Sequence, residues 1–98
     1  MITIFPSPTI DQVHDQALAV ARVDYRDDPR QLRRMERILP VAAMRELCRP
    51  MPTYTEIGHQ LNVPMAIAHR ADQHWEKIPE LERRAMMLAV VRKLTGKS

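Results

Sequence analysis

Arginine is the residue type with the clearest binding chemistry in this 98-residue chain. Four arginines recur at spacings of three and four residues, which places them on one face of a helix: Arg30, Arg33, Arg34 and Arg37. A guanidinium group can donate two parallel hydrogen bonds to a phosphate. The row predicts one of two things: a ridge that contacts phosphate groups, or a face that is only solvated, with Asp28 and Glu36 nearby.

A second set of residues has the chemistry of base recognition. A helix that begins at Pro64 and runs to about Lys77 would expose five residues toward its amino-terminal end: Met65, Ala66, His69, Arg70 and Gln73. In the major groove of DNA, arginine matches guanine, glutamine matches adenine, and small apolar side chains pack on thymine methyl groups. These five residues are therefore candidate base-reading residues, with Asp72 toward the flank of the helix.

Catalytic and metal-binding patterns are missing from the sequence. His69 and His74 are five residues apart, which separates them by about 140° around a helix. Neither a Cys-x-x-Cys nor a His-x-x-x-His pair occurs, and we find no glycine-rich phosphate loop or nucleophile elbow. We therefore expect no enzyme activity, no metal, no cofactor and no small-molecule substrate.

Composition narrows the class of protein. The chain has 15 Lys and Arg against 12 Asp and Glu, a mild basic bias that is compatible with nucleic acid without requiring it. One cysteine, Cys48, cannot form an internal disulfide, and neither a leader nor an apolar run long enough to cross a membrane is apparent. These features predict a single-domain cytoplasmic protein, nucleoid-associated when it is bound to DNA.

Two long helices are predicted in the first half of the chain. Thr9 and Gln12 form a capping box that starts a helix near Ile10, and the apolar pattern of this helix ends at residues 22–24. Asp28 followed by Pro29 starts a second helix, which carries the arginine row. Pro40 interrupts it and predicts a kink or two abutting helices.

The segment 53–78 has the pattern of a helix-turn-helix. Thr53 and Glu56 form a capping box for a short helix from Tyr54 to about Leu61, and Asn62 suits a left-handed turn before the helix at Pro64. Gly58 fits a close approach between crossing helices. The residues at the amino terminus of the short helix are candidate phosphate contacts: Thr53, Tyr54 and Thr55. The alternative interpretation is a plain packing corner.

A last helix is predicted over residues 79–95, started by Pro79 and ended by Gly96. Its apolar residues cover more than one face and include Met86 and Met87. Two interpretations stay open: the helix closes the core, or residues 79–94 use a methionine-rich surplus face to bind a second copy or another protein.

From about residue 37 to 75 the chain resembles the C-terminal duplex-DNA-binding domain of the bacterial replication initiator DnaA, in the TrpR-like helix-turn-helix group. The matching motifs are "MRELC" (44–48), "TYTEIGHQL" (53–61) and "AHRA" (68–71). The resemblance implies a compact helical domain in which basic residues before the helix-turn-helix help to clamp the DNA backbone. Where that family has its Arg-Asp-His specificity run, this chain has "PMAI" (64–67), and the ATPase module of the initiator is missing.

We therefore expect an all-α, compact domain of five to six helices spanning residues 1–98, with a helix-turn-helix core at 53–78. The expected function is sequence-specific binding of double-stranded DNA by a small bacterial or phage transcriptional regulator. Two other functions remain open: a protein-interaction adaptor that docks a partner through its last helix, and a binder of nucleoid DNA without sequence preference.

Overall fold

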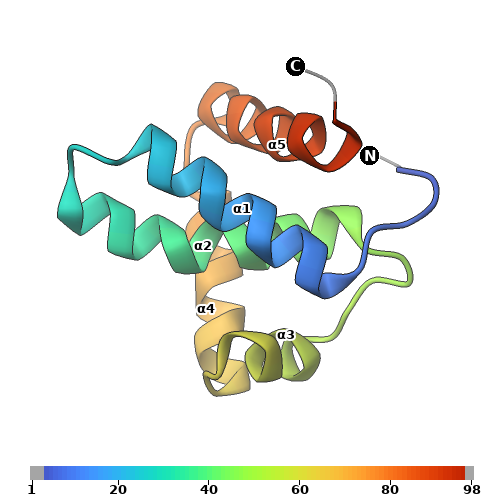
Figure 1. Ribbon diagram of the computed structural model, residues 1–98. Coiled ribbons are helices and arrows are strands. Elements are labelled where there is room, and N and C mark those ends of the chain that lie inside the picture. The colour runs from blue at the N-terminus through green and yellow to red at the C-terminus, as the bar shows by residue number, and fades with distance from the viewer. Residues whose placement is uncertain (1–3, 97–98) are drawn as a thin grey trace.

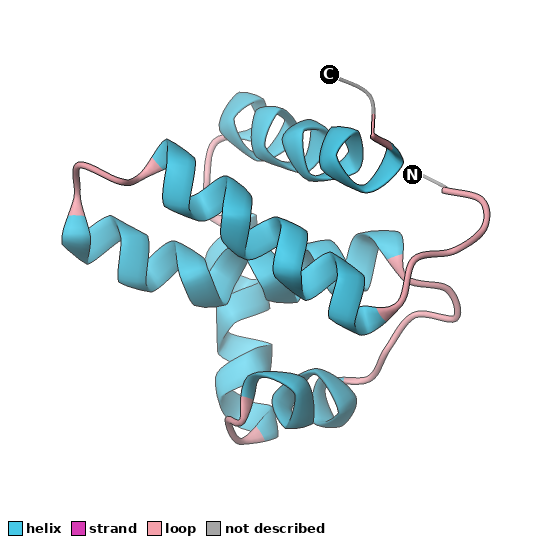
Figure 2. Cartoon of the chain, viewed as in Figure 1, coloured by secondary structure: helices cyan, strands magenta, loops and turns pink. Residues whose placement is uncertain are grey.

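The computed structural model describes residues 4–96, and within this range the regular structure is helical throughout (Figures 1 and 2). The helices are α1 (Ile10–Asp24), α2 (Pro29–Leu47), α3 (Tyr54–Leu61), α4 (Met65–Glu76) and α5 (Glu80–Thr95). This confirms the predicted all-α class, with five helices in the described part of the chain.

Capping side chains set where the first three helices begin. The Thr9 hydroxyl accepts a hydrogen bond from the Gln12 amide at 3.1 Å, and the Gln12 side-chain oxygen accepts one from the Thr9 amide at 2.9 Å. Thr53 and Glu56 form the same reciprocal box at α3. Each box satisfies backbone N–H groups that a helix end would otherwise leave unpaired. These predicted caps are confirmed.

Two prolines lie one position earlier than predicted relative to their helices. Pro64 and Pro79 occupy the N-cap positions of α4 and α5, so these helices begin at Met65 and Glu80. Both prolines have an extended ψ, 152° for Pro64 and 141° for Pro79. The fixed φ of proline suits this position as well as the first helical turn.

Helix α2 continues through Pro40. The sequence allowed a kink or two abutting helices at this point, and two helices are excluded because α2 runs unbroken from Pro29 to Leu47. Pro40 is buried between Leu39 and Val41, neither of which has measurable exposure. Burial of this segment offsets the cost of an internal proline, which is roughly 3 kcal/mol.

Helix α2 is the centre of the core. In Figure 1, α1 lies along one side of α2, α5 packs on α1, and α4 crosses α2 and reaches α3 at its far end. Every helix contributes buried side chains to one cluster, among them Val13, Ala17, Leu39, Ala43, Met44, Leu47, Ile57, Ala68, Trp75 and Val90. This arrangement holds α2 and α4 in direct contact.

The turn between α3 and α4 is tight. Asn62 adopts the left-handed conformation, with φ 58° and ψ 46°, as predicted. The Val63 amide donates to the Gly58 carbonyl at 2.8 Å. A Cβ atom at Gly58 would lie 2.6 Å from the Val63 carbonyl oxygen, so only glycine fits against this backbone.

Of the two interpretations left open for the last helix, the one in which α5 closes the core is confirmed. Met86 and Met87 are buried, so the interpretation of a methionine-rich binding face is wrong. The apolar residues that α5 does expose are Leu81, at 78% of its surface, and Leu88, at 44%. The methionines lie inward because they share a face of α5 with Val90, which packs on the core.

Candidate nucleic-acid interface

Helix α4 presents one continuous exposed face. All five predicted base-reading residues are exposed and lie on it: Met65, Ala66, His69, Arg70 and Gln73. The opposite face is anchored in the core by Ala68, Ala71 and Trp75. Gln73 lies near the middle of the exposed face, because helical geometry places Ala66, His69 and Arg70 around it.

One edge of this face adjoins the arginine row of α2. An open hollow of about 260 Å³ lies along the junction of the two helices. We call it the α2–α4 hollow; its lining residues are Arg33, Arg34, Arg37 and Ile38 from α2, and Ile67, Arg70, Ala71 and His74 from α4. Arg37 and Arg70, which are 33 positions apart in sequence, therefore belong to one surface.

The acidic residues near the row do not neutralise it. Glu36 accepts from the Arg22 guanidinium of α1 at 3.0 Å, and Asp28 accepts from the Gln31 amide at the start of α2. The ion pairs of the described residues include none of the four arginines of the α2–α4 hollow. The rim of the hollow is therefore a concentration of unpaired positive charge.

The arginine row also borders the turn. A second hollow of about 260 Å³ is lined by Arg33 and Arg37 together with the turn residues Asn62 and Val63. Arg33 and Arg37 thus stand between this second hollow and the α2–α4 hollow. Arg30 is exposed, but it lines neither hollow, because it lies about one turn nearer the start of α2.

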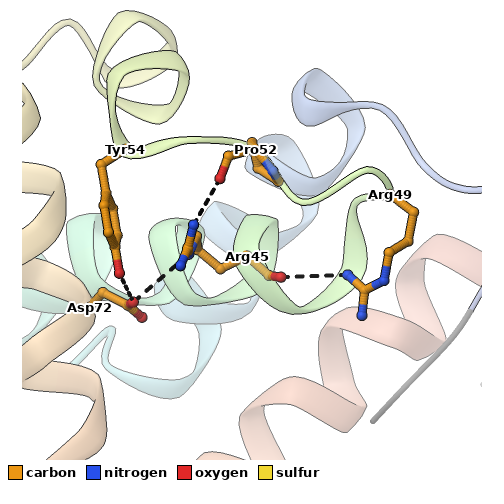
Figure 3. Close-up of polar contacts among 5 residues, drawn as sticks. All are labelled: Arg45, Arg49, Pro52, Tyr54 and Asp72. Carbon is orange, nitrogen blue, oxygen red and sulfur yellow. Dashed lines mark hydrogen bonds and ion pairs between the residues drawn. The ribbon is translucent and has the colours of Figure 1, made fainter.

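The other edge of α4 faces α3, and there the Asp72 side chain contacts Tyr54 and Arg45 (Figure 3). The Tyr54 hydroxyl donates to the Asp72 carboxylate at 2.5 Å. The Arg45 guanidinium lies over the Tyr54 ring at 4.3 Å, donates to the Pro52 carbonyl at 3.0 Å, and has its Nε atom 3.9 Å from Asp72. His69 meets the Tyr54 ring edge-on at 4.8 Å. This network ties α2, α3 and α4 together.

This network affects which residues at the amino terminus of α3 are free to contact a phosphate. Burial raises the pKa of the Tyr54 hydroxyl above its usual value of 10.0, and its hydrogen bond to Asp72 raises that pKa further. The hydroxyl therefore keeps its proton at neutral pH and remains a donor to Asp72. Thr53 is committed to the capping box, whereas Thr55 is exposed. Of the three residues predicted to contact phosphate, Thr55 is exposed and belongs neither to the capping box nor to the network around Tyr54.

Sequence reasoning missed the structural importance of Arg45. It treated this residue only as part of a motif, and it placed Asp72 at the flank of α4 without a partner. Arg45 and Asp72 are 27 positions apart, and no local spacing connects them. Only the packing of α2 against α4 brings them together.

The described residues include few other groups that could form a metal-binding or reactive site. Between residues 4 and 96, His, Cys, Asp and Glu side chains form no group of three or more that could hold a metal ion. The Cys48 thiol is buried, and burial raises its pKa. In the same range, no helix combines the length and the apolar character that a membrane span requires.

Comparisons of the chain with known protein families, with characterised proteins and with solved structures find no match.

Proposed function

We propose that this chain binds duplex DNA, with α3 and α4 acting as a helix-turn-helix and α4 entering the major groove. The observation that carries the proposal is the continuity between the exposed face of α4 and the unpaired arginines of the α2–α4 hollow. A groove-reading helix needs polar side chains for bases and cations for the flanking phosphates. Both lie here on one surface.

Each part of this surface has a distinct role in the proposal. Gln73, in the middle of the face, is placed to bond adenine, and Met65 and Ala66 to pack on thymine methyl groups. The arginines of α2 supply affinity for phosphates that depends on salt but not on sequence. Thr55, at the start of α3, adds a phosphate contact through its exposed hydroxyl. Regulation of transcription is the use that fits a small reader of this kind.

The experiment that tests the proposal is selection of bound duplexes from a random pool at about 150 mM salt, where exposed charges are screened beyond about 8 Å. Enrichment of a defined motif is the expected result. Gln73→Ala should lose the preference at one base pair, at a cost of about 1–3 kcal/mol, since a bidentate contact disappears. Arg84→Ala, a change on the distant α5, should leave the motif unchanged.

Two results would contradict the proposal in different ways. Retention of duplexes without any enriched motif would mean binding without sequence preference, which a steep salt dependence would identify. Failure to retain any duplex at that salt would remove DNA as the partner.

A second candidate function is binding of a protein partner through the outer face of α5. The supporting observation is that Leu81, Ala85 and Leu88 are all exposed, at spacings of four and three residues. This spacing is typical of a helix-helix seam, and a second copy of the chain is the simplest occupant. Sedimentation equilibrium should then detect a dimer that Leu81→Ser dissociates, and a monomer at all concentrations would exclude it.

A further inference from the structure

The α2–α4 hollow combines a charged rim with an apolar floor. Arg33, Arg34 and Arg37 reach it from one side and Arg70 from the other, while Ile38, Ile67 and Ala71 lie beneath. Like charges gathered around one open space repel one another, and a bound anion relieves that repulsion. The rim therefore favours an anionic ligand over a neutral one.

The shape of the α2–α4 hollow narrows the class of anion. Its volume of about 260 Å³ falls below the roughly 300–1,000 Å³ of small-molecule pockets, so it suits part of a larger ligand. Guanidinium groups bind phosphate through paired hydrogen bonds. An apolar floor suits the carbon skeleton of a sugar. A sugar-phosphate unit matches both surfaces.

The position of the α2–α4 hollow indicates where that unit comes from. When a helix lies in the major groove, the two phosphate backbones run along its edges. Arg70 lies at the edge of the exposed face of α4, toward α2, whereas Gln73 lies near the middle. A backbone that passes this edge would meet Arg70 and the arginine row together.

We propose that the α2–α4 hollow binds one backbone phosphate and its deoxyribose, and that Arg70 is a ligand of this phosphate and not a reader of guanine. The inference rests on the proposed DNA-binding function and assigns a new role within that surface. Arg34 and Arg37 bind the same phosphate from α2, which fixes how deeply α4 enters the groove. Base reading then belongs to Gln73, His69 and the apolar residues at the start of α4.

The salt dependence of duplex binding tests the assignment. We would measure Kd from about 50 to about 200 mM salt for the wild type, Arg70→Ala, Arg37→Ala and the control Arg84→Ala, on a preferred and on a scrambled duplex. Each lost phosphate contact lowers the slope by about 0.9, which shrinks the loss of affinity over this range roughly 3.5-fold. Arg70→Ala and Arg37→Ala should do so equally on both duplexes.

Arg84→Ala should leave the slope unchanged. This arginine is paired with Glu80 at 2.9 Å and lies on α5, away from the α2–α4 hollow. All three variants change exposed side chains on helices, so circular dichroism should show the same helical content in each.

Two outcomes would overturn the assignment while the proposed function survives. In one, Arg70→Ala relaxes the preference at a single base pair and leaves the slope unchanged, as expected of a base-reading residue. In the other, inorganic phosphate titrated at constant ionic strength binds the protein tightly without DNA, which would make the site one for a free anion. Failure of the wild type to bind any duplex would refute the proposed function itself.

Discussion

The two edges of α4 use the same residue type in opposite ways. On the α3 side, Arg45 is held by the Tyr54 ring, the Pro52 carbonyl and the Asp72 carboxylate. On the α2 side, Arg70 faces other arginines and is exposed. An arginine that has partners within the fold fixes the position of a helix. An arginine without such partners is free to contact a ligand.

This difference explains how a small protein can hold α4 in place on one edge and keep arginine side chains without ion-pair partners on the other. Arg45 and Asp72 are less than one third exposed, so their interaction is less screened than that of a surface pair. The paired edge anchors α4 to α2 and α3, while the arginines of the unpaired edge form no ion pair with the described residues. Substitutions at the two edges should therefore have separable effects on stability and on binding.

The largest effect is expected from a change that disturbs both edges at once. Gly58→Ala would place a Cβ atom 2.6 Å from the Val63 carbonyl oxygen, and the turn between α3 and α4 would have to shift. Such overpacking costs about 1–3 kcal/mol, more than the roughly 0.5–1 kcal/mol that alanine adds to a helix. Urea unfolding should show the loss, together with weaker duplex binding.

Gly96→Ala is the control for Gly58→Ala. It imposes a left-handed strain of about 1–2 kcal/mol at φ +73° but meets no atom within 4 Å, and it lies far from α4. It should lower stability without a change in DNA preference. An unaltered urea midpoint for Gly58→Ala would refute the tight-turn explanation.

A pair of arginine substitutions sharpens the comparison directly. Arg45→Ala removes the contact with the Tyr54 ring and the bond to Pro52, and it leaves Asp72 with one partner fewer. We expect a loss of about 1–2 kcal/mol in the free energy of unfolding. Arg37→Ala should change that free energy by less than about 0.5 kcal/mol yet weaken duplex binding. Equal losses in the free energy of unfolding of the two variants, measured in urea, would contradict the proposed difference between the two edges.

Tyr54→Phe tests one bond of the paired edge. It keeps the ring against Arg45 and His69 but removes the donor to Asp72, so we expect a loss of about 1 kcal/mol. Tyr25→Phe is the matched control, because the Tyr25 hydroxyl donates only to the Met86 sulfur, a weak acceptor, at 3.5 Å. Thermal unfolding should separate the two variants, and identical melting temperatures would count against a role for the Asp72 bond.

The smallest expected effect depends on pH. Tyr54 in the unfolded chain loses its proton near its usual pKa of 10.0, whereas burial raises its pKa in the folded protein. Above about pH 10 the unfolded state therefore binds fewer protons, and the free energy of unfolding falls as pH rises toward the folded pKa. Melting temperatures measured from about pH 8 to about pH 11 should fall more steeply in the wild type than in Tyr54→Phe. Parallel curves would contradict this link.

The caps, the turn and the helix class were readable from local sequence. Thr53 and Glu56, and likewise Asn62, act within four residues of their partners, so their spacing alone specifies the geometry. Pro40 was less readable, because its tolerance depends on how much of α2 is buried. The faces of α5 left two interpretations open for a similar reason: helical period shows which residues share a face, but not which face meets the core.

In the candidate site, too, some features could be predicted from local sequence and others could not. Its five outward residues on α4 and its four arginines on α2 were each predicted from periodicity within one helix. The approach of Arg70 to three of these arginines around the α2–α4 hollow, and the hydrogen bond from Tyr54 to Asp72 across 18 positions, were not.

The sequence by itself determined which segments are helical and, to within one residue, where α4 and α5 begin, because capping, turn conformation and apolar period act over a few residues. Only the tertiary structure decided which arginines are paired and which remain free. That choice depends on the side chains that packing brings together from distant helices, and the energy of a charge is set by those neighbours more than by the residue that carries it.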